Sequence, residues 1–412
     1  MSGVSGAMLR ELRLWADVGL RAVSRRSSGK IRLSDGHLSR VERGLRPVTP
    51  AVLAAYERAL GMRIDPYTVN DLTAGNEPDD ADRRAFQATV ATLAAGTPTG
   101  GLGGEGEQRL LQEARYMRVP QRITATDVTH LEQAALTLRS LDQRFGGELT
   151  SQIGGLLLRW AVGQRAADMS EPVGRAWCAA FGRLATWAAW SAHDACQPRV
   201  ARALSVLGLD AAVRADEPDV RAHVLCDIAA CHNAQGHPEE ALRTVRLAGG
   251  DERTHPAVAT ILHGVRARAY ATLGERECCA REIRLLEGVA ATVDPDAVPG
   301  WFGGWQPAHV TALCGHAYAD LARATGDPDA LAAAHAALVT AAERLVEVRP
   351  RAAALCLTHL AHAHRKCGDL DHVVGLVARA QHLAGGLRSA RVNADLAGLR
   401  GSTVGEAPPA RS

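Results

Sequence analysis

The first sixty residues carry apolar side chains at helical spacing, which predicts four short amphipathic helices. The predicted helices cover residues 8–16, 20–27 and 35–43, and a fourth begins at Pro50. Ser34 or Asp35 can cap the third helix, and Thr49 can cap the fourth, which has Pro50 at its first position. Residues 1–65 are therefore expected to form a small all-α domain.

Residues 66–124 differ in composition, being rich in Pro, Gly, Asp and Thr, most plainly in NEPDD and AGTPTGGLGGEGE. Such a composition is typical of a linker. A short helix at about residues 80–95 can interrupt it, because DADRRAFQATVATLA has helical character. The sequence leaves open whether this helix packs on either neighbouring domain.

Beyond residue 125 one pattern recurs: an Ala-rich helix, a tight turn, and a second helix opened by Asp, Glu or Pro. The predicted turn residues are Cys196, Gly236, Gly274, Gly326 and Gly368. Successive turns are 40, 38, 52 and 42 residues apart, which is longer and less regular than the roughly 34 residues of an ideal tetratricopeptide array. Residues 125–395 are therefore expected to form an α-solenoid of helical hairpins, followed by a disordered tail over 396–412.

The longest interval between turns contains DPDAVPGWFGGWQP, residues 294–307. Its Pro, Gly and Trp content predicts an ordered loop that lies against the solenoid. We interpret its tryptophans, Trp301 and Trp305, as core or loop anchors and not as a cage for a ligand.

The charge is distributed unevenly along the chain. Residues 1–65 contain twelve Lys and Arg against six Asp and Glu, whereas the remainder contains thirty-five against thirty-nine. A small basic domain suits a polyanionic partner such as nucleic acid. A pair of basic helices that is merely solvated is the alternative.

Cysteine usage and hydropathy indicate the compartment. All nine cysteines lie beyond residue 177 and none forms a CxxC pair, which is typical of small core residues in a reduced compartment. No stretch approaches eighteen uninterrupted apolar residues, and the first fifteen residues lack the pattern of a secretory signal. We therefore expect a cytoplasmic protein without a membrane contact.

The basic domain has the layout of a helix-turn-helix, in which the second helix of the motif enters the major groove. Residues 35–43 are the candidate recognition helix, because Leu38 and Val41 would face the core and leave Arg40 exposed for a bidentate pair with guanine. The side chains placed for phosphate contacts are Arg21, Lys30, Arg32, Arg43 and Arg46.

The segment LSRVERGLRPVTPAVLAAYERALG resembles the recognition helix and following helix of lambda-repressor-type (Xre/Cro) regulators. The resemblance covers about residues 8–62, and HLSRVERG is its most specific piece. It implies a DNA-binding function in which His37, Ser39 and Arg40 read bases.

The chain departs from this family pattern in the turn of the motif. Several more residues than usual separate Arg26 from His37, and Leu20 with Arg21 stands where a Gln customarily opens the second helix. The longer turn either adds backbone contacts to DNA or marks a domain that has lost DNA binding.

Residues 125–390 are similar to the tetratricopeptide-like halves of such regulators in GC-rich bacteria. The resemblance implies a module for dimerisation and signal sensing, which binds a peptide or a partner helix along its concave face. His223, Cys226 and Asn233 would point to that face, where an Asn side chain can hydrogen-bond a peptide backbone. Ordinary packing is the alternative for each of the three.

One helix of the array carries a group of potential metal ligands. Cys356, His359, His362 and His364 lie close together on one predicted helix, but they share a face only in i,i+3 pairs and no ligand outside the helix is identifiable, so no metal or cofactor is assigned. The phosphate-loop, GxSxG, HExxH and dinucleotide motifs are absent from the sequence, and no enzymatic activity is predicted.

The sequence therefore predicts a transcriptional regulator that binds specific double-stranded DNA. It would dimerise through its helical array, and a peptide, small ligand or protein bound to the array would set its DNA affinity. The alternative is a protein-interaction scaffold whose N-terminal domain no longer binds DNA.

Overall fold

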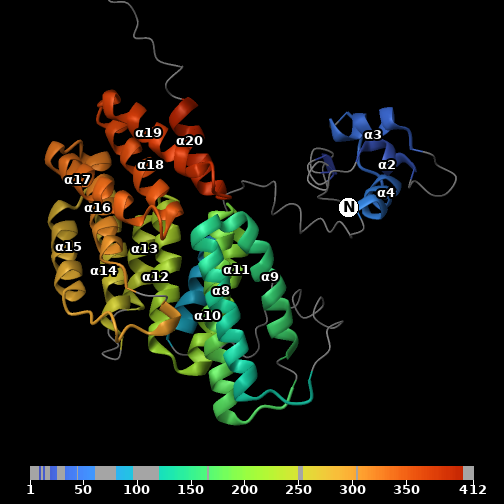
Figure 1. Cartoon of the computed structure of the whole chain (residues 1–412), viewed down its shortest axis with the longest axis horizontal. Helices are drawn as coiled ribbons and strands as arrows, with labels where there is room; N and C mark the ends of the chain where they lie inside the picture. Colours follow the sequence, from blue (N-terminus) through green and yellow to red (C-terminus); the bar gives the residue numbers. More distant parts are fainter. Residues whose placement is uncertain are drawn as a thin grey trace, which may run out of the picture. The chain divides into compact units, whose positions relative to one another are not determined.

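The computed structural model divides the chain into two compact units, Met1–Glu77 and Pro78–Ser412 (Figure 1). The described residues are 9–10, 13, 19–25, 33–43, 45–60, 80–95, 120–164, 167–248, 254–302 and 305–401. Their regular structure is helical, apart from one isolated bridge between Arg122 and Asp168. The predicted all-α architecture is confirmed.

The N-terminal unit contains the helices α2 (Leu20–Arg25), α3 (Asp35–Glu42) and α4 (Pro50–Leu60), and residues 9, 10 and 13 are also helical. Their apolar faces meet in one core, because burial of apolar surface drives the packing of amphipathic helices. Its fully buried members are Leu9, Val23, Leu38, Val41, Val52, Ala55 and Tyr56. The second, third and fourth predicted helices are confirmed, and the first is described only in part.

Side-chain caps fix where these helices begin. The Ser34 hydroxyl accepts a hydrogen bond from the backbone N–H of His37 at 3.2 Å, and Thr49 accepts one from Val52 at 3.4 Å. The Ser24 hydroxyl donates to the Leu33 carbonyl at 2.6 Å. This last bond joins the two flanks of the lengthened turn, although the turn itself lies outside the described residues.

The second unit is an array of antiparallel helical hairpins (Figure 1). Its paired helices are α8 (Ala125–Phe145) with α9 (Gly147–Gly163), α10 (Glu171–Asp194) with α11 (Pro198–Ala215), α12 (Pro218–Ala234) with α13 (Pro238–Arg246), α14 (Pro256–Thr272) with α15 (Arg276–Ala290), α16 (Pro307–Thr325) with α17 (Pro328–Leu345), and α18 (Pro350–Lys366) with α19 (Leu370–Ala384). None of the helices in the described ranges combines the length and the apolar composition of a membrane span.

The turns inside the hairpins lie where the sequence predicted them. Gly236, Gly274, Gly326 and Gly368 have φ angles between 71° and 81°, and Cys196 has a φ of 56°. Glycine adopts this left-handed conformation without the steric cost of a Cβ atom, so it ends one helix and lets the chain reverse. The predicted degenerate turn at Cys196 is confirmed as well.

Helix α6 (Asp80–Ala94), which falls within the predicted linker, packs against α11 and α13. The side-chain amide of Gln87 lies 2.7 Å from the Nε2 atom of His232, and the Phe86 ring packs against the same imidazole. The predicted helix at residues 80–95 is thus present, and it belongs to the repeat unit. The sequence left open on which neighbour this helix packs, and the structure places it against α11 and α13.

The repeat unit also extends further toward the C-terminus than predicted. Helix α20 (Ala390–Gly401) packs on α18 and α19, and it buries Leu396 and Leu399. The predicted boundary between a repeat domain ending at 395 and a tail over 396–412 is therefore wrong, because apolar side chains continue at helical spacing to Leu399.

The loop after α15 packs against the array, as predicted. It includes a single 3₁₀ turn, η2 (Gly300–Phe302). The ring of Phe302 is buried, and Trp301 and Phe302 both contact the His223 imidazole edge to face. The aromatic loop therefore covers part of the array with its own side chains.

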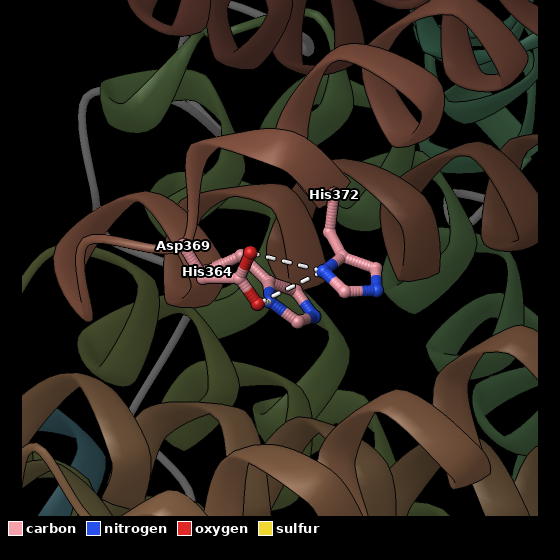
Figure 2. Close-up of side chains that lie close together, drawn as sticks. All are labelled: His364, Asp369 and His372. Carbon is pink, nitrogen blue, oxygen red and sulfur yellow. Dashed lines mark hydrogen bonds and ion pairs between the residues drawn. The ribbon is translucent and has the colours of Figure 1, made fainter.

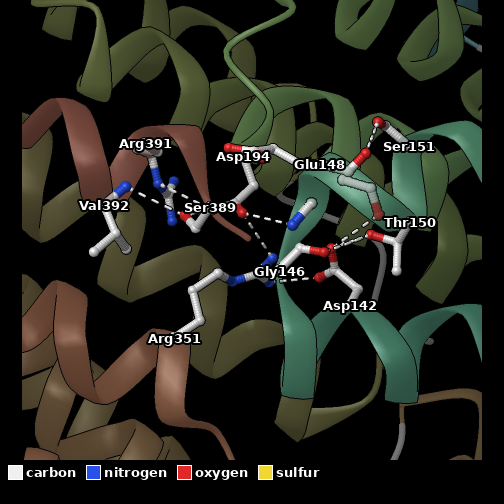
Figure 3. Close-up of polar contacts among 12 residues, drawn as sticks. Asp142, Gly146, Glu148, Thr150, Ser151, Asp194, Arg351, Ser389, Arg391 and Val392 are labelled. Carbon is white, nitrogen blue, oxygen red and sulfur yellow. Dashed lines mark hydrogen bonds and ion pairs between the residues drawn. The ribbon is translucent and has the colours of Figure 1, made fainter. Parts of the chain in front are cut away.

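A buried polar cluster joins the first helices of the array to the last (Figure 3). The Arg351 guanidinium on α18 forms ion pairs with Asp142 on α8 and with Asp194 on α10, the latter at 3.3 Å. Asp194 also accepts hydrogen bonds from the backbone N–H of Gly147 at 2.8 Å and from the Ser389 hydroxyl at 2.9 Å. The array is consequently closed on itself at this cluster.

Candidate nucleic-acid interface

Helix α3 has one buried face and one exposed face. Leu38 and Val41 are completely buried in the core, as predicted. Arg40 and Arg43 are exposed, while His37 and Ser39 are partly exposed. The structure therefore brings the three predicted base-reading residues, His37, Ser39 and Arg40, to the surface of one helix.

Three of the five predicted phosphate contacts lie at the two ends of this helix. Arg21 on α2 has a side chain that is 87% exposed, and it lies 3.6 Å from Asp35 at the start of α3. Arg43 and Arg46 are exposed at the other end of α3. Two further predicted phosphate contacts, Lys30 and Arg32, lie outside the described residues.

A buried ion pair anchors α3 from behind. The Arg13 guanidinium donates to both carboxylate oxygens of Glu42, at 2.6 and 3.0 Å, and the Tyr56 hydroxyl donates to Glu42 at 2.6 Å. Burial alone raises the pKa of Glu42, but the hydrogen bonds from Arg13 and Tyr56 and the charge of Arg13 outweigh it, so the pKa lies below its ordinary value. The negative charge of Glu42 is thus neutralised inside the domain and not on the exposed face.

Sequence reasoning missed this anchor. Arg13 and Glu42 are 29 positions apart, so no helical periodicity links them. A charged residue on the apolar side of a short helix was the available signal, because Glu42 directly follows Val41 in a helix whose core face is otherwise apolar.

The predicted effector-binding residues do not lie on an open surface. His223, Cys226 and Asn233 are all buried. Burial lowers the pKa of His223 to about 3, so its imidazole is neutral beside Trp187 and Phe302. The possible binding face at these three residues is therefore not exposed, and the alternative of ordinary packing holds. Trp301 and Phe302 cover His223, and Cys226 belongs to the apolar core.

Asn233 has an internal partner in place of a peptide. Its side-chain amide donates to the backbone carbonyl of Val265 on the next hairpin at 3.0 Å. Such a bond is the ordinary way to satisfy a buried amide. Asn233 therefore helps to hold α12 against α14.

The four metal-ligand candidates of α18 have separate partners. The Nε2 atom of His359 lies 2.7 Å from Asp320, and the Sγ atom of Cys356 lies 3.8 Å from the Nε2 atom of His316. His364 contacts Asp369. Cys356, His359 and His364 therefore face different partners and do not converge on one point.

No family model, no curated protein and no solved structure matches the chain.

Proposed function

We propose that the protein is a transcriptional regulator that binds specific sites in double-stranded DNA through helix α3. One observation carries this proposal: α3 exposes Arg40 and Arg43, with His37 and Ser39 partly exposed beside them, while its opposite face is fixed in a core. A helix that is rigidly held and basic on its outer face suits insertion into the major groove.

We assign the exposed basic side chains either to base contacts or to phosphate contacts. Arg40 lies on the exposed face in the last turn of α3, where a guanidinium can donate two parallel hydrogen bonds to the O6 and N7 atoms of guanine. Arg21, Arg43 and Arg46 lie at the edges, where they would contact phosphates. Because Glu42 is buried and paired with Arg13, it does not repel the DNA backbone.

We assign dimerisation to the repeat unit. Helix α9 packs mainly on α8 and α10, and it leaves Leu149 and Leu156 exposed two turns apart. A second copy of the chain would bury these leucines, as expected of an apolar patch that serves association. The peptide, protein or small ligand that sets the DNA affinity would then act through this unit, in the cytoplasm.

The proposal is tested by selecting double-stranded genomic fragments with the full-length protein at moderate salt. We expect a few fragments to be enriched strongly, with the enrichment lost in Arg40→Ala. Arg284→Ala removes the same charge from an exposed position on α15 and should select like the unaltered chain. If the unaltered protein is folded and selects no fragment, the scaffold alternative is favoured.

A further inference from the structure

Three helices of the repeat unit bring titratable side chains together at one end of a hairpin. His335 lies on α17, His364 near the end of α18, and His372 on the first turn of α19. Asp369 lies in the turn between α18 and α19, directly after Gly368, whose φ of 81° reverses the chain. Figure 2 shows the imidazoles of His364 and His372 turned toward the carboxylate of Asp369.

The distances in this cluster are short. The Nδ1 atom of His364 lies 2.9 Å from one carboxylate oxygen of Asp369, and the Nδ1 atom of His372 lies 3.0 and 2.9 Å from the two oxygens. One ligand atom from each of the three residues lies within 4.8 Å of the others. The Nε2 atom of His364 is 2.9 Å from the Nδ1 atom of His335.

The position of Asp369 supplies an independent observation. Asp369 is the N-cap residue of α19, where an Asp side chain ordinarily accepts hydrogen bonds from the first backbone N–H groups of the helix. It makes no such bond here. Its carboxylate faces the two imidazoles instead. An oxygen that could cap the helix therefore lies between two ring nitrogens.

We propose that His364, Asp369 and His372 bind a divalent transition-metal ion, with Zn²⁺ as the best match. Two imidazole nitrogens and one carboxylate oxygen are the donor set that zinc accepts, with bonds of about 2.0–2.2 Å. Tetrahedral ligands at such distances are about 3.3 Å from one another. To admit the ion, each nitrogen needs to move a few tenths of an ångström away from the oxygen. The two nitrogens, which lie within 4.8 Å of each other, need to approach to about 3.3 Å, which a rotation of the half-exposed His372 side chain can supply.

The surroundings of the three ligands fit a metal that keeps an open position. His364 is only 4% exposed, whereas His372 is 54% exposed and Asp369 35% exposed. A metal held from one side by the protein can then take a water molecule or an external ligand on the other side. His335 orients the site, since it pairs with the nitrogen of His364 that faces away from the metal, as the partners of metal-binding histidines ordinarily do.

Metal binding also fits the proton positions. Without a metal, each Nδ1 atom that faces Asp369 carries the proton of the hydrogen bond. The metal takes the place of these two protons, each of which moves to the Nε2 atom of its own ring. The Nε2–H group of His364 then donates to the Nδ1 atom of His335, and the proton that this Nδ1 atom carried moves to the Nε2 atom of His335. The exchange leaves both imidazoles neutral, which is the form that binds a metal.

The site is tested by titrating the full-length protein with Zn²⁺, after treatment with a chelator and its removal, in the presence of a thiol reductant. We expect a saturable Zn²⁺ site whose affinity falls at least about 100-fold in His372→Ala and in Asp369→Asn, and about 10–100-fold in His335→Ala. His382→Ala removes an exposed histidine from the same helix and should bind Zn²⁺ like the unaltered chain. Because His372 is half exposed, its truncation leaves the fold in place, which the melting temperature without metal checks.

Absorption spectra with Co²⁺ identify the donor atoms. We expect the weak visible bands of cobalt bound to nitrogen and oxygen, without a thiolate charge-transfer band. A thiolate band would place the ion at a cysteine, for example at Cys356 beside His316, and would overturn the proposal. Zn²⁺ binding that is absent from the unaltered chain, or undiminished in His372→Ala, would overturn it equally.

Discussion

Asp142 and Arg351 are 209 positions apart in the sequence and form an ion pair in the interior of the repeat unit. Their side chains are 4% and 7% exposed. Since Asp142 belongs to α8 and Arg351 to α18, the pair holds the first hairpin of the array against the last (Figure 3). A helical array of this kind is ordinarily stabilised by contacts between neighbours alone, so this pair gives it a long-range connection.

Replacing Arg351 should weaken the packing of α18 against α8 and α10, because it removes the ion pairs with Asp142 and Asp194. Arg351→Met retains most of the side-chain volume but leaves Asp142 and Asp194 buried without their cation. Removing one partner of a buried ion pair typically costs about 3–5 kcal/mol, which we expect as a lower melting temperature of the repeat unit. The control is Arg344→Met, at an exposed position on α17, and equal melting temperatures for the two variants would contradict the closure.

The same cluster predicts a loss of stability in acid. Burial alone raises the pKa of Asp194, but Arg351, Arg391 and the N–H of Gly147 outweigh it and hold the pKa below its ordinary value of 3.8. A folded-state pKa below the unfolded one adds stability at higher pH, and this stability is lost as the pH falls through the folded-state pKa. Urea unfolding should therefore show a decrease in stability below about pH 4.

Two variants test whether Asp194 causes this loss of stability in acid. Asp194→Asn should unfold more easily at neutral pH and should lose less stability between neutral pH and acid than the unaltered chain. Asp296→Asn, at an exposed position after α15, should keep the full acid dependence. An unchanged acid dependence in Asp194→Asn would contradict the assignment.

Gly146 lies against the backbone of Arg388 at this closure. Its φ of 94° with a ψ of 172° is a conformation that only glycine adopts readily, and a Cβ atom there would lie 2.5 Å from the carbonyl oxygen of Arg388. Gly146→Ala should therefore destabilise the repeat unit by at least about 1–3 kcal/mol. Gly155→Ala, in the interior of α9 with open space at its Cβ position, should stabilise it by up to about 1 kcal/mol. Thermal melting of both variants checks the opposite signs.

Local signals made the individual hairpins predictable. The turns at Cys196 and at Gly236 are predictable because the end of one helical pattern and the start of the next lie within a few positions of each other. The structure has both residues at positive φ. The closure through Arg351 could not be found in this way. Its partners lie on helices that the sequence places at opposite ends of the array, and no periodic pattern connects them.

In the candidate sites, too, features set by local periodicity are predictable and features set by distant residues are not. The outer face of α3 follows from helical periodicity alone, since Leu38 and Val41 fix which side is buried. The burial of His223 could not be predicted, because the side chains that cover it come from a loop almost eighty positions later. The cluster around Asp369 does not follow from the periodicity of α18. It depends on the turn after Gly368, which folds Asp369 and His372 back onto His364, and on His335 from another helix.

Glu42 should stabilise helix α3 from inside the N-terminal unit. Glu42→Ala leaves Arg13 and the Tyr56 hydroxyl without their buried partner, and we expect the N-terminal unit to lose about 3 kcal/mol of stability. Hydrogen exchange of the full-length protein should then show faster exchange in α3 and α4, while exchange in the repeat unit stays unchanged. If exchange in α3 stays slow, the pair with Arg13 does not anchor this helix.

Arg43 should contribute to DNA affinity but not to sequence preference. It lies at the end of α3, where its guanidinium would contact a phosphate, and each such contact releases about one counterion when DNA binds. Arg43→Ala should weaken binding to all fragments alike and should reduce the slope of log affinity against log salt by about 1.

Arg40→Ala should instead cost about 1–3 kcal/mol at one base position and relax the preference there. Titrations of one selected fragment and one unrelated fragment at several salt concentrations separate the two effects. If Arg43→Ala changes the preference between the two fragments, α3 enters the groove in a different orientation, with its C-terminal end against the bases.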